Sequence, residues 1–312
     1  MRIIIIKGKQ ADQIFGLPVL ENMEKCRLCP RNCNINREET VGYCGVGDEI
    51  KIGRAAPHYW EEPFISGENG SGTVFFSGCS LHCVFCQNKK ISGGELGRTV
   101  SVEELAEIYL SLEASGVHNV NLVTATHYTE KVAESIILAK KRGCRSPFLW
   151  NSSGYEHVET LKKLDGLIDI YLPDMKYHSS ELSKKYSNCP DYFELSSKAI
   201  HEMRRQTGTP LVKNGLLKYG TVVRHLVLPN CADDSKKVIE YLYSTYGDSI
   251  YISIMSQYVP FGNVPEEINR RITEEEYNDV VEYAQSIGVT NAFLQERESA
   301  VESFIPEFYE TE

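Results

Sequence analysis

The fold is decided by the segment Thr73-Val74-Phe75-Phe76-Ser77-Gly78-Cys79-Ser80-Leu81-His82-Cys83-Val84-Phe85-Cys86. A short β-rich run, residues 73–76, leads directly into three cysteines with the spacing Cys-x3-Cys-x2-Cys. Amphipathic stretches with helical spacing then alternate with further β-rich runs. These runs cover residues 120–123, 148–150, 167–172, 221–228, 250–255 and 291–294. Seven strands separated by helices predict βα repeats around a parallel sheet, curled into a full or partial (β/α) barrel.

The helices between these runs have recognisable starting residues. Ser101 and Glu104 have the spacing of a capping box, and Gly116 ends the helix that follows. Later helices are expected to start near Thr129, Asp234 and Thr273. In barrels of this type the chemistry lies on loops at the carboxyl ends of the strands. We therefore expect the functional residues in the loops that follow the predicted strands.

The composition indicates an ordinary globular protein. Of the 312 residues, 42% are hydrophobic and 24% are charged, and no run approaches the ~18 apolar residues of a membrane span. The net charge of -10, with scattered basic residues, argues against binding to nucleic acid. The first nine residues lack the features of a signal peptide, so a cytoplasmic location is expected. We expect an irregular N-terminal extension (1–71), a barrel core (72–300) and an acidic tail (301–312).

Ten cysteines are too few for a disulfide scaffold, which carries roughly 8–10% cysteine. Seven of them fall in two groups, and Cys144, Cys189 and Cys231 are solitary. A solitary cysteine is most often a small buried apolar residue. Clustered, reduced cysteines in a cytosolic chain instead indicate metal binding.

The second group is Cys79, Cys83 and Cys86. Three thiolates on one loop can bind three irons of a 4Fe-4S cluster, whereas a closed cluster uses four cysteines. No fourth cysteine lies nearby in the sequence, so one iron would be left open for an added ligand. The alternative is a zinc site completed by His82 or by water.

This cysteine loop after a first strand resembles the signature of the radical S-adenosylmethionine (radical SAM) enzymes, down to the aromatic Phe85 before the last cysteine. Segments along nearly the whole chain resemble, more narrowly, the pyruvate formate-lyase-activating-enzyme-like iron-sulfur proteins. They include residues 61–63, 126–128, 151–155, 174–177, 224–226 and 255–258. The resemblance implies a partial (β/α) barrel whose open iron chelates the amino and carboxylate groups of S-adenosylmethionine. Reductive cleavage then yields methionine and a 5'-deoxyadenosyl radical that abstracts hydrogen from a substrate.

The resemblance also implies which residues would hold the cofactor. Phe85 would pack near the adenine, although an ordinary core aromatic is equally expected. The family often ends its second strand with Gly-Gly-Glu, which receives the methionine amino group. Here residues 93–95 have that sequence but follow the cysteines at once, so we interpret them as a turn. We assign the amino-group role to the 124–127 loop, with Thr126 and His127 as the binding side chains.

Polar residues at the ends of the later strands complete the expected site. Asn151 and Ser152 end the third strand and Asp174 and Lys176 end the fourth, where the resemblance implies contacts to a small cation or to the ribose and carboxylate of the cofactor. A solvated charge pair is the alternative for Asp174 and Lys176. Arg224 lies inside an apolar run and is expected to bind the cofactor carboxylate or to form a structural ion pair. Gln257 and Tyr258 are expected on the substrate side.

The first group, Cys26-x2-Cys29-x3-Cys33-x10-Cys44, supplies four thiolates and can close a metal site. A structural zinc and an auxiliary iron-sulfur cluster both suit four thiolates. The short spacing of the first three cysteines favours the cluster.

The resulting hypothesis is a radical SAM enzyme with an unidentified substrate. A glycyl radical enzyme is a candidate partner, because the glycyl-radical activases are similar proteins, and the resemblance implies a reductant protein such as flavodoxin or ferredoxin. A non-catalytic iron-sulfur electron-transfer or sensor protein is the alternative, but an electron carrier gains nothing from an open iron. A zinc-stabilised binding module would leave Asp174, Lys176 and Arg224 without a role.

Overall fold

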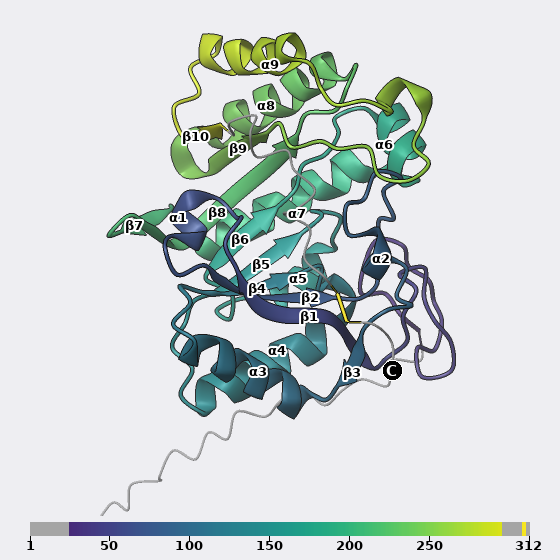
Figure 1. Cartoon of the computed structure of the whole chain (residues 1–312), viewed down its shortest axis with the longest axis vertical. Helices are drawn as coiled ribbons and strands as arrows, with labels where there is room; N and C mark the ends of the chain where they lie inside the picture. Colours follow the sequence, from purple (N-terminus) through teal and green to yellow (C-terminus); the bar gives the residue numbers. More distant parts are fainter. Residues whose placement is uncertain (1–24, 295–307, 310–312) are drawn as a thin grey trace, which may run out of the picture.

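The computed structural model describes residues 25–294 and 308–309, which form a mixed α/β structure around one ten-stranded sheet (Figure 1). Seven strands are parallel to one another: β2 (Ser71–Phe76), β4 (Val120–Val123), β5 (Phe148–Ser152), β6 (Ile170–Pro173), β8 (Leu216–Leu226), β9 (Tyr251–Met255) and β10 (Ala292–Leu294). They correspond to the seven predicted strands. The predicted strand 148–150 continues to Ser152 in β5. The predicted strand 167–172 corresponds to β6, which begins at Ile170 rather than at residue 167.

The sheet is open. Its strand order is β10-β9-β8-β6-β5-β4-β2-β1-β3, so in the described part of the chain β10 and β3 each pair with one neighbour and do not meet. The curled arrangement is therefore a partial barrel, which was one of the two predicted forms. Most of the expected acidic tail, 301–312, lies outside the described residues.

Three antiparallel strands were not predicted: β1 (Ile50–His58), β3 (Arg98–Val100) and β7 (Leu211–Lys213). The expectation that residues 1–71 are irregular is wrong for β1, which pairs with β2 along its length, Ile52 opposite Phe76. Its sequence lacks a clear alternation of apolar and polar residues, because Gly53, Arg54 and Pro57 interrupt it. Its pairing with β2 and β3 is long-range, and propensity in one segment does not reveal such pairing.

The described residues form nine α-helices, which include the four predicted near residues 101, 129, 234 and 273 and five that were not individually predicted. They are α1 (Pro63–Ser66), α2 (Lys89–Ser92), α3 (Val102–Ala114), α4 (Thr129–Lys141), α5 (Val158–Lys162), α6 (Ser180–Ser187), α7 (Tyr192–Thr207), α8 (Ala232–Tyr246) and α9 (Glu274–Ser286). Ser101 with Glu104, and Thr273 with Glu276, form complete capping boxes. Asp234 does not start α8, which begins at Ala232; its carboxylate accepts the backbone N–H groups of His178 and Ser179 instead. No described helix is long and apolar enough to cross a membrane.

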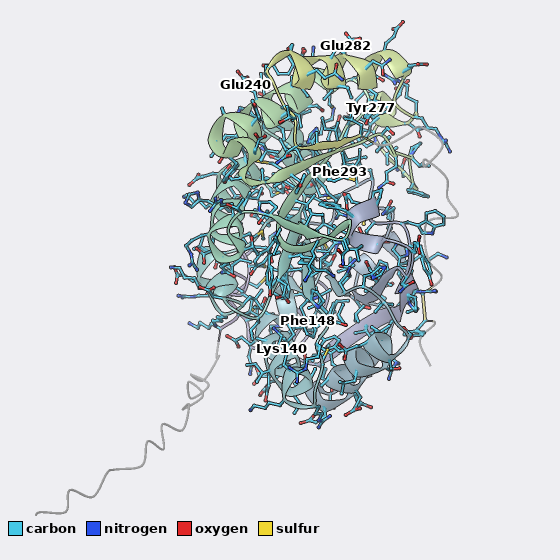
Figure 2. All side chains as sticks on the ribbon, turned by 90° about the vertical axis from the view of Figure 1, so that its left-hand side faces the viewer. Lys140, Phe148, Glu240, Tyr277, Glu282 and Phe293 are labelled. Carbon is cyan, nitrogen blue, oxygen red and sulfur yellow. The ribbon has the colours of Figure 1, made fainter. Side chains whose placement is uncertain are left out.

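The hydrophobic core extends along the sheet as several clusters of buried side chains. In Figure 1, α3 and α4 lie beside the β1–β2 end of the sheet, and α8 and α9 lie beside the β9–β10 end. Figure 2 shows Lys140 near Phe148 in the lower part, where the ammonium group is 5.5 Å from the ring centroid, and Tyr277 at the upper end. The Tyr277 hydroxyl donates to the Ile254 carbonyl and attaches α9 to β9.

Helix α1 covers one end of the curved sheet. Phe64 of α1 packs against Phe293 of β10 and Tyr251 of β9, with ring centroids 4.2 and 5.0 Å apart. Phe64 and Ile65 are buried with apolar residues of β5, β6 and β8. This packing holds the segment before α1, which contains Glu61 and Glu62, against the curved sheet rather than in solvent.

Candidate functional site

A cavity of about 170 Å³ opens at the carboxyl ends of the parallel strands. This is the place where (β/α) barrels carry their chemistry. The cavity brings together three thiols, two cations and several amide and hydroxyl groups from six parallel strands and the loops after them. Its lining includes Cys79, Cys83, Cys86, Phe85, Thr124, Asn151, Ser152, Asp174, Lys176, Arg224, Gln257 and Tyr258.

The cysteine loop is held in place by backbone contacts. Gly78 has a φ of +89°, and a Cβ at this position would lie 2.7 Å from the Cys44 carbonyl oxygen, so glycine is required there. The Leu81 N–H donates to Cys79 Sγ at 3.3 Å, and the Ser187 hydroxyl donates to Cys83 Sγ at 3.1 Å. Hydrogen bonds to the ligand sulfurs are one of the means by which a protein tunes an iron-sulfur cluster.

The donor set at this loop fits a cluster with three protein ligands. Burial raises the pKa of the Cys86 thiol to about 12, and burial also raises the pKa of Cys83, although the nearby Lys176 lowers it. A bound cation is the usual means by which several buried thiolates coexist, because the metal deprotonates the thiols that coordinate it. The described lining of the cavity contains no fourth cysteine.

His82 does not join the three cysteines. Its Nε2 donates to the Tyr43 carbonyl oxygen at 2.8 Å, and its φ is +53°. The histidine-completed zinc site considered from the sequence therefore lacks its fourth ligand in this arrangement. Among the described residues, no three His, Cys, Asp or Glu side chains converge closely enough to hold one metal ion.

Arg224 is the centre of a buried ion-pair network. Its Nε donates to Asp174 Oδ1 at 3.0 Å, its Nη1 to Glu61 Oε2 at 3.2 Å, and its Nη2 to Asn151 Oδ1 at 2.6 Å. The structural ion pair, one of the two readings of Arg224, is present. Arg224 also lines the cavity, so its remaining N–H groups are available to an anionic ligand.

Asp174 and Lys176 are not a solvated charge pair. Their side chains are 14% and 16% exposed, and Lys176 Nζ lies 2.6 Å from Asp174 Oδ2. Burial opposes ionisation of Asp174, but Lys176 and Arg224 together lower its pKa, so it is charged at neutral pH. The pKa of Lys176 is raised by Asp174 in spite of burial. The alternative of a solvent-exposed pair is wrong, and both residues face the cavity.

The assignment of the amino-group role to Thr126 and His127 does not match their positions. Both are buried, neither lines the cavity, and each has a partner elsewhere. His127 Nε2 donates to the Ser77 carbonyl oxygen at 2.8 Å, and burial lowers the pKa of this imidazole to about 3, so it is neutral. Within the same loop, Thr124 lines the cavity, with a φ of +61°. The short 3-10 turn from Thr126 to Tyr128 turns the two expected side chains inward.

A buried glutamate that was not predicted supports the end of β5. Glu156 Oε1 accepts from the Thr126 hydroxyl at 2.8 Å and from Trp150 Nε1 at 2.9 Å, and Oε2 accepts from the Ser152 hydroxyl at 2.6 Å. Thr126 therefore acts on the cavity indirectly, through Glu156 and Ser152. A carboxylate six residues after the end of an apolar run is a weak sequence signal, and only the fold brings these side chains together.

Phe85 and the turn at 93–95 lie as expected. Phe85 lines the cavity and packs edge-to-face against Tyr258 and Tyr186, with centroids 5.8 and 6.5 Å apart, so it is both a cavity wall and a core aromatic. Gly93 and Gly94 follow α2 and form a turn that is not part of β4 or of the loop after it. A Cβ on Gly94 would lie 2.3 Å from the Gly45 carbonyl oxygen, so the turn packs tightly on the first cysteine segment.

The first cysteine group packs directly against the second. Cys26, Cys29 and Cys44 are buried and Cys33 is partly buried. The Cys79 N–H donates to the Cys44 carbonyl oxygen at 3.0 Å. Burial, aided by the nearby Cys44, Cys26 and Cys33, raises the pKa of Cys29 to about 12. The other three thiols therefore lie near enough to Cys29 to affect its pKa, although no three of the described side chains converge on one metal position.

Arg31 connects the two cysteine groups. Its guanidinium donates to the carbonyl oxygens of Ser80 at 2.7 Å, Asn188 at 2.6 Å and Ser187 at 3.0 Å. It also lies over the Tyr43 ring, 4.1 Å from the centroid. In Figure 1 the purple segment that carries the first group lies at the right, beside α2.

Two acidic residues that the sequence did not assign to the site, Glu61 and Glu62, lie under the cavity. They line a second, smaller cavity of about 100 Å³ that shares Asn151, Arg224 and Gln257 with the first. Their sequence signal was the Glu-Glu-Pro segment at 61–63, two carboxylates directly before a proline that starts a helix. That segment supported the resemblance, but nothing in it indicates burial.

Comparison with known proteins identifies relatives of this chain. The family model described as "Radical SAM superfamily" matches residues 73–241. The curated protein "Uncharacterized protein MJ0674" of Methanocaldococcus jannaschii is 30% identical over 275 residues, which are 84% of this chain and 75% of that protein. "Uncharacterized protein MJ0808" of the same organism is 25% identical over 231 residues, 69% of this chain and 63% of that protein.

Solved structures that match include two further proteins. A domain of pyruvate-formate lyase-activating enzyme from Bacteroides vulgatus has a TM-score of 0.40 and 14% identity, covering 54% of this chain and 92% of that one. Methylornithine synthase (PylB) has a TM-score of 0.46 and 15% identity, covering 69% of this chain and 60% of that one.

Proposed function

This chain belongs to the radical SAM superfamily, and from that membership we propose that it cleaves S-adenosylmethionine reductively to start radical chemistry on a substrate. Members of the superfamily use a 4Fe-4S cluster and S-adenosylmethionine, and the cleavage supplies a 5'-deoxyadenosyl radical that removes a hydrogen atom. The observation that carries the proposal is the open donor set: Cys79, Cys83 and Cys86 face a cavity whose described lining holds no fourth cysteine. A closed electron-transfer cluster uses four.

The residues around the cysteines have separate tasks in this proposal. Arg224 and Lys176 offer N–H groups to the cofactor carboxylate, while Asp174 holds both cations in place. Thr124 and Ser152, at the ends of β4 and β5, offer hydroxyl groups to the ribose or the amino group. Ser152 is oriented by its hydrogen bond to Glu156. Arg224, Lys176 and Ser152 are already paired within the protein, so binding costs little reorganisation of these groups.

Aromatic side chains close one wall of the cavity. Phe85 packs against Tyr258, whose hydroxyl donates to the Ile268 carbonyl oxygen and is thereby fixed. The wall excludes water from the place where a reactive radical would form, and it offers an apolar surface for the adenine. Protection of a reactive species is a task of the protein rather than of the cofactor.

The first cysteine group is proposed to hold a second iron-sulfur cluster that relays electrons. The hydrogen bond from the Cys79 N–H to the Cys44 carbonyl joins the two cysteine segments directly, which supports a short electron path. A structural zinc at the four cysteines is the competing assignment. The electron donor in this proposal is a reductant protein such as flavodoxin or ferredoxin.

The proposal is tested by anaerobic reconstitution with iron and sulfide, dithionite reduction, low-temperature electron paramagnetic resonance and assay for 5'-deoxyadenosine. We expect a cluster signal that changes on addition of S-adenosylmethionine, and 5'-deoxyadenosine that is lost in Cys83→Ala. Cys144→Ala, a buried solitary cysteine outside the cavity, is the matched control and should retain the product. A cluster signal that does not change on addition of S-adenosylmethionine, together with no 5'-deoxyadenosine, would support the electron-transfer alternative.

A further inference from the structure

The second cavity continues the first: the two share seven lining residues, Arg224 among them, and the second adds Glu61 and Glu62. It is lined by Glu61 and Glu62 from the segment before α1, by Gln87 and Asn88 from the loop after the cysteines, and by Met255 and Gln257 after β9. None of Cys79, Cys83 and Cys86 is part of its lining. It adjoins the first cavity through residues common to both.

Both carboxylate oxygens of Glu61 have hydrogen-bond partners within the protein. Glu61 Oε1 accepts from Asn121 Nδ2 at 2.9 Å and from Asn151 Nδ2 at 3.3 Å, and Oε2 accepts from Arg224 at 3.2 Å. These bonds satisfy both of its oxygens within the protein. Glu61 therefore orders Arg224 and Asn151 and has no evident need for a ligand.

Glu62 differs from Glu61. It is 7% exposed, and its Oε2 has no hydrogen-bond partner among the described residues. The buried Ser253 hydroxyl is near enough to affect the pKa of Glu62, but it is not at hydrogen-bond geometry and also lacks a partner in the described chain. An unsatisfied buried polar atom costs about 1–3 kcal/mol, and more when charged. A folded protein keeps such a cost where a ligand relieves it.

Among the described residues, Glu62 has no cationic partner in the ion-pair network beside the two cavities. Glu62 is buried, and Glu61 and Asp174 are 9% and 14% exposed. Asp174 pairs with Lys176 and Arg224, and Glu61 pairs with Arg224, which leaves Glu62 without an ion-pair contact in the described chain. Burial, the largest cause, raises the pKa of Glu62, Arg224 lowers it and Glu61 raises it. A positively charged ligand group beside Glu62 would favour its charged form and pair with it.

We propose that the second cavity binds the substrate and that Glu62 receives a protonated amino group of it. This inference rests on the proposed function, because it takes the first cavity as the place of S-adenosylmethionine. The methionine amino group of that cofactor is expected at the cysteine loop, and no cysteine lines the second cavity. A primary ammonium suits the site because its three divergent donors can pair with Glu62 and with side-chain amide oxygens of the same lining, such as those of Asn88 and Gln257, whereas a guanidinium favours two parallel oxygens of one carboxylate.

The probe for this proposal is n-butylammonium, with the uncharged 1-butanol as its matched ligand control. Binding is measured by calorimetry to the reconstituted protein loaded with S-adenosylmethionine, for the wild type and for Glu62→Gln. We expect at least a tenfold weaker Kd for n-butylammonium in the variant and no change for 1-butanol. Glu202→Gln, another buried glutamate but one already paired with Arg205, is the protein control and should bind like the wild type.

Protein stability separates a ligand-binding role from a structural one. Without ligand, Glu62→Gln should unfold at the same free energy as the wild type or a higher one, because it removes an uncompensated carboxylate. If glutamine does not fold, Glu62→Asp keeps the charge and is expected to retain selectivity for the ammonium over the alcohol.

Three results would overturn the proposal. Equal Kd values for n-butylammonium in wild type and Glu62→Gln would remove the carboxylate from binding. If Glu62→Gln also bound S-adenosylmethionine itself more weakly, the ammonium group that pairs with Glu62 would be that of the cofactor and not that of a substrate. Loss of stability without a change in Kd would make Glu62 structural. Failure of the proposed function is seen separately: the wild type would form no 5'-deoxyadenosine, whether or not it binds n-butylammonium.

Discussion

The two cysteine groups lie side by side, yet they differ in what surrounds them. Cys79, Cys83 and Cys86 follow the end of a central parallel strand, and all three side chains face a cavity. The group that begins at Cys26 lies on the outside of that loop, and three of its four members are buried. The first group has four thiols, whereas the second has three and opens onto polar strand ends. The number of thiols therefore distinguishes the two groups, as it distinguishes closed metal sites from open ones.

The contact between the groups is made by backbone rather than by side chains. Gly45 and Gly94 approach so closely that a Cβ on either would meet the carbonyl carbon or oxygen of the other segment. The Cys44 carbonyl accepts from the cysteine loop, and Arg31 donates to the Ser80 carbonyl oxygen of that loop and to two carbonyl oxygens at the end of α6. Such an interface sets the spacing of the two groups without using the residues that bind ligands.

The largest expected effect comes from removal of the open group. In the triple variant Cys79→Ala, Cys83→Ala, Cys86→Ala, we expect S-adenosylmethionine cleavage to be lost completely, while iron remains at the first group. Metal analysis of the purified, reconstituted variant measures this. The double variant Cys26→Ala, Cys29→Ala is the counterpart, which should lose iron at the first group but still bind S-adenosylmethionine. Zinc without iron in the triple variant would contradict the relay cluster.

The junction between the groups is tested by Gly45→Ala. Gly45 has a φ of +83°, and an added Cβ would lie 2.0 Å from the Gly93 carbonyl oxygen, so the two segments must separate. We expect a loss of roughly 3 kcal/mol or more in the free energy of unfolding, as overpacking against backbone adds to conformational strain.

Gly116→Ala is the control for the junction. It has a similar φ of +87° but no atom within 4 Å of the added Cβ, so it should lose only about 1 kcal/mol. Urea denaturation of both variants gives the comparison. Equal losses would show that the close approach between the segments carries no energy of its own.

A smaller effect is expected from His127, which joins both regions. Its imidazole donates to the Ser77 carbonyl before the cysteine loop, and its own carbonyl accepts from Arg37 in the first cysteine segment. Burial lowers the pKa of His127 to about 3, and Arg37 and His82 lower it as well. An unfolded histidine has a pKa near 6.5, so below that pH the unfolded chain binds more protons than the folded one.

The contribution of neutral His127 to the free energy of unfolding should therefore be fully present above about pH 6.5 and be lost as the pH decreases toward 3. Between pH 6.5 and 5 this contributes a slope of up to about 1.4 kcal/mol per pH unit. His127→Gln keeps an N–H donor for Ser77 but does not titrate, so its unfolding free energy should depend less on pH. Urea denaturation at several pH values, compared between the two proteins, measures the difference. Parallel curves would show that the imidazole is not buried as described.

The sequence predicted well wherever the signal was local. Each of the seven parallel strands and the Ser101–Glu104 capping box could be predicted from short segments, because apolar runs and caps depend on neighbours in the chain. The cysteine spacing indicated a cluster site, the strand ends indicated Asn151 and Asp174, and a charge inside an apolar run indicated Arg224. All of these side chains do line one cavity.

The predictions failed where orientation or long-range pairing decided the outcome. Thr126 and His127 follow β4, but a single 3-10 turn directs them into the core and leaves Thr124 at the cavity. Strand β1 has no local pattern and exists because β2 and β3 pair with it. Glu156 lies in a loop, and only the packing of β5 shows that it holds Ser152.

By itself, the sequence determined the order of the seven parallel strands, the two cysteine groups and the chemistry that three close thiols permit. These features depend on covalent spacing and on local periodicity. The tertiary structure decided that the two groups are joined, that Arg224 is shared between Asp174 and Glu61, and that Glu62 is buried with an oxygen unpaired. Burial and long-range pairing arise only when distant segments pack, so no local pattern could reveal the charges that surround the cavities.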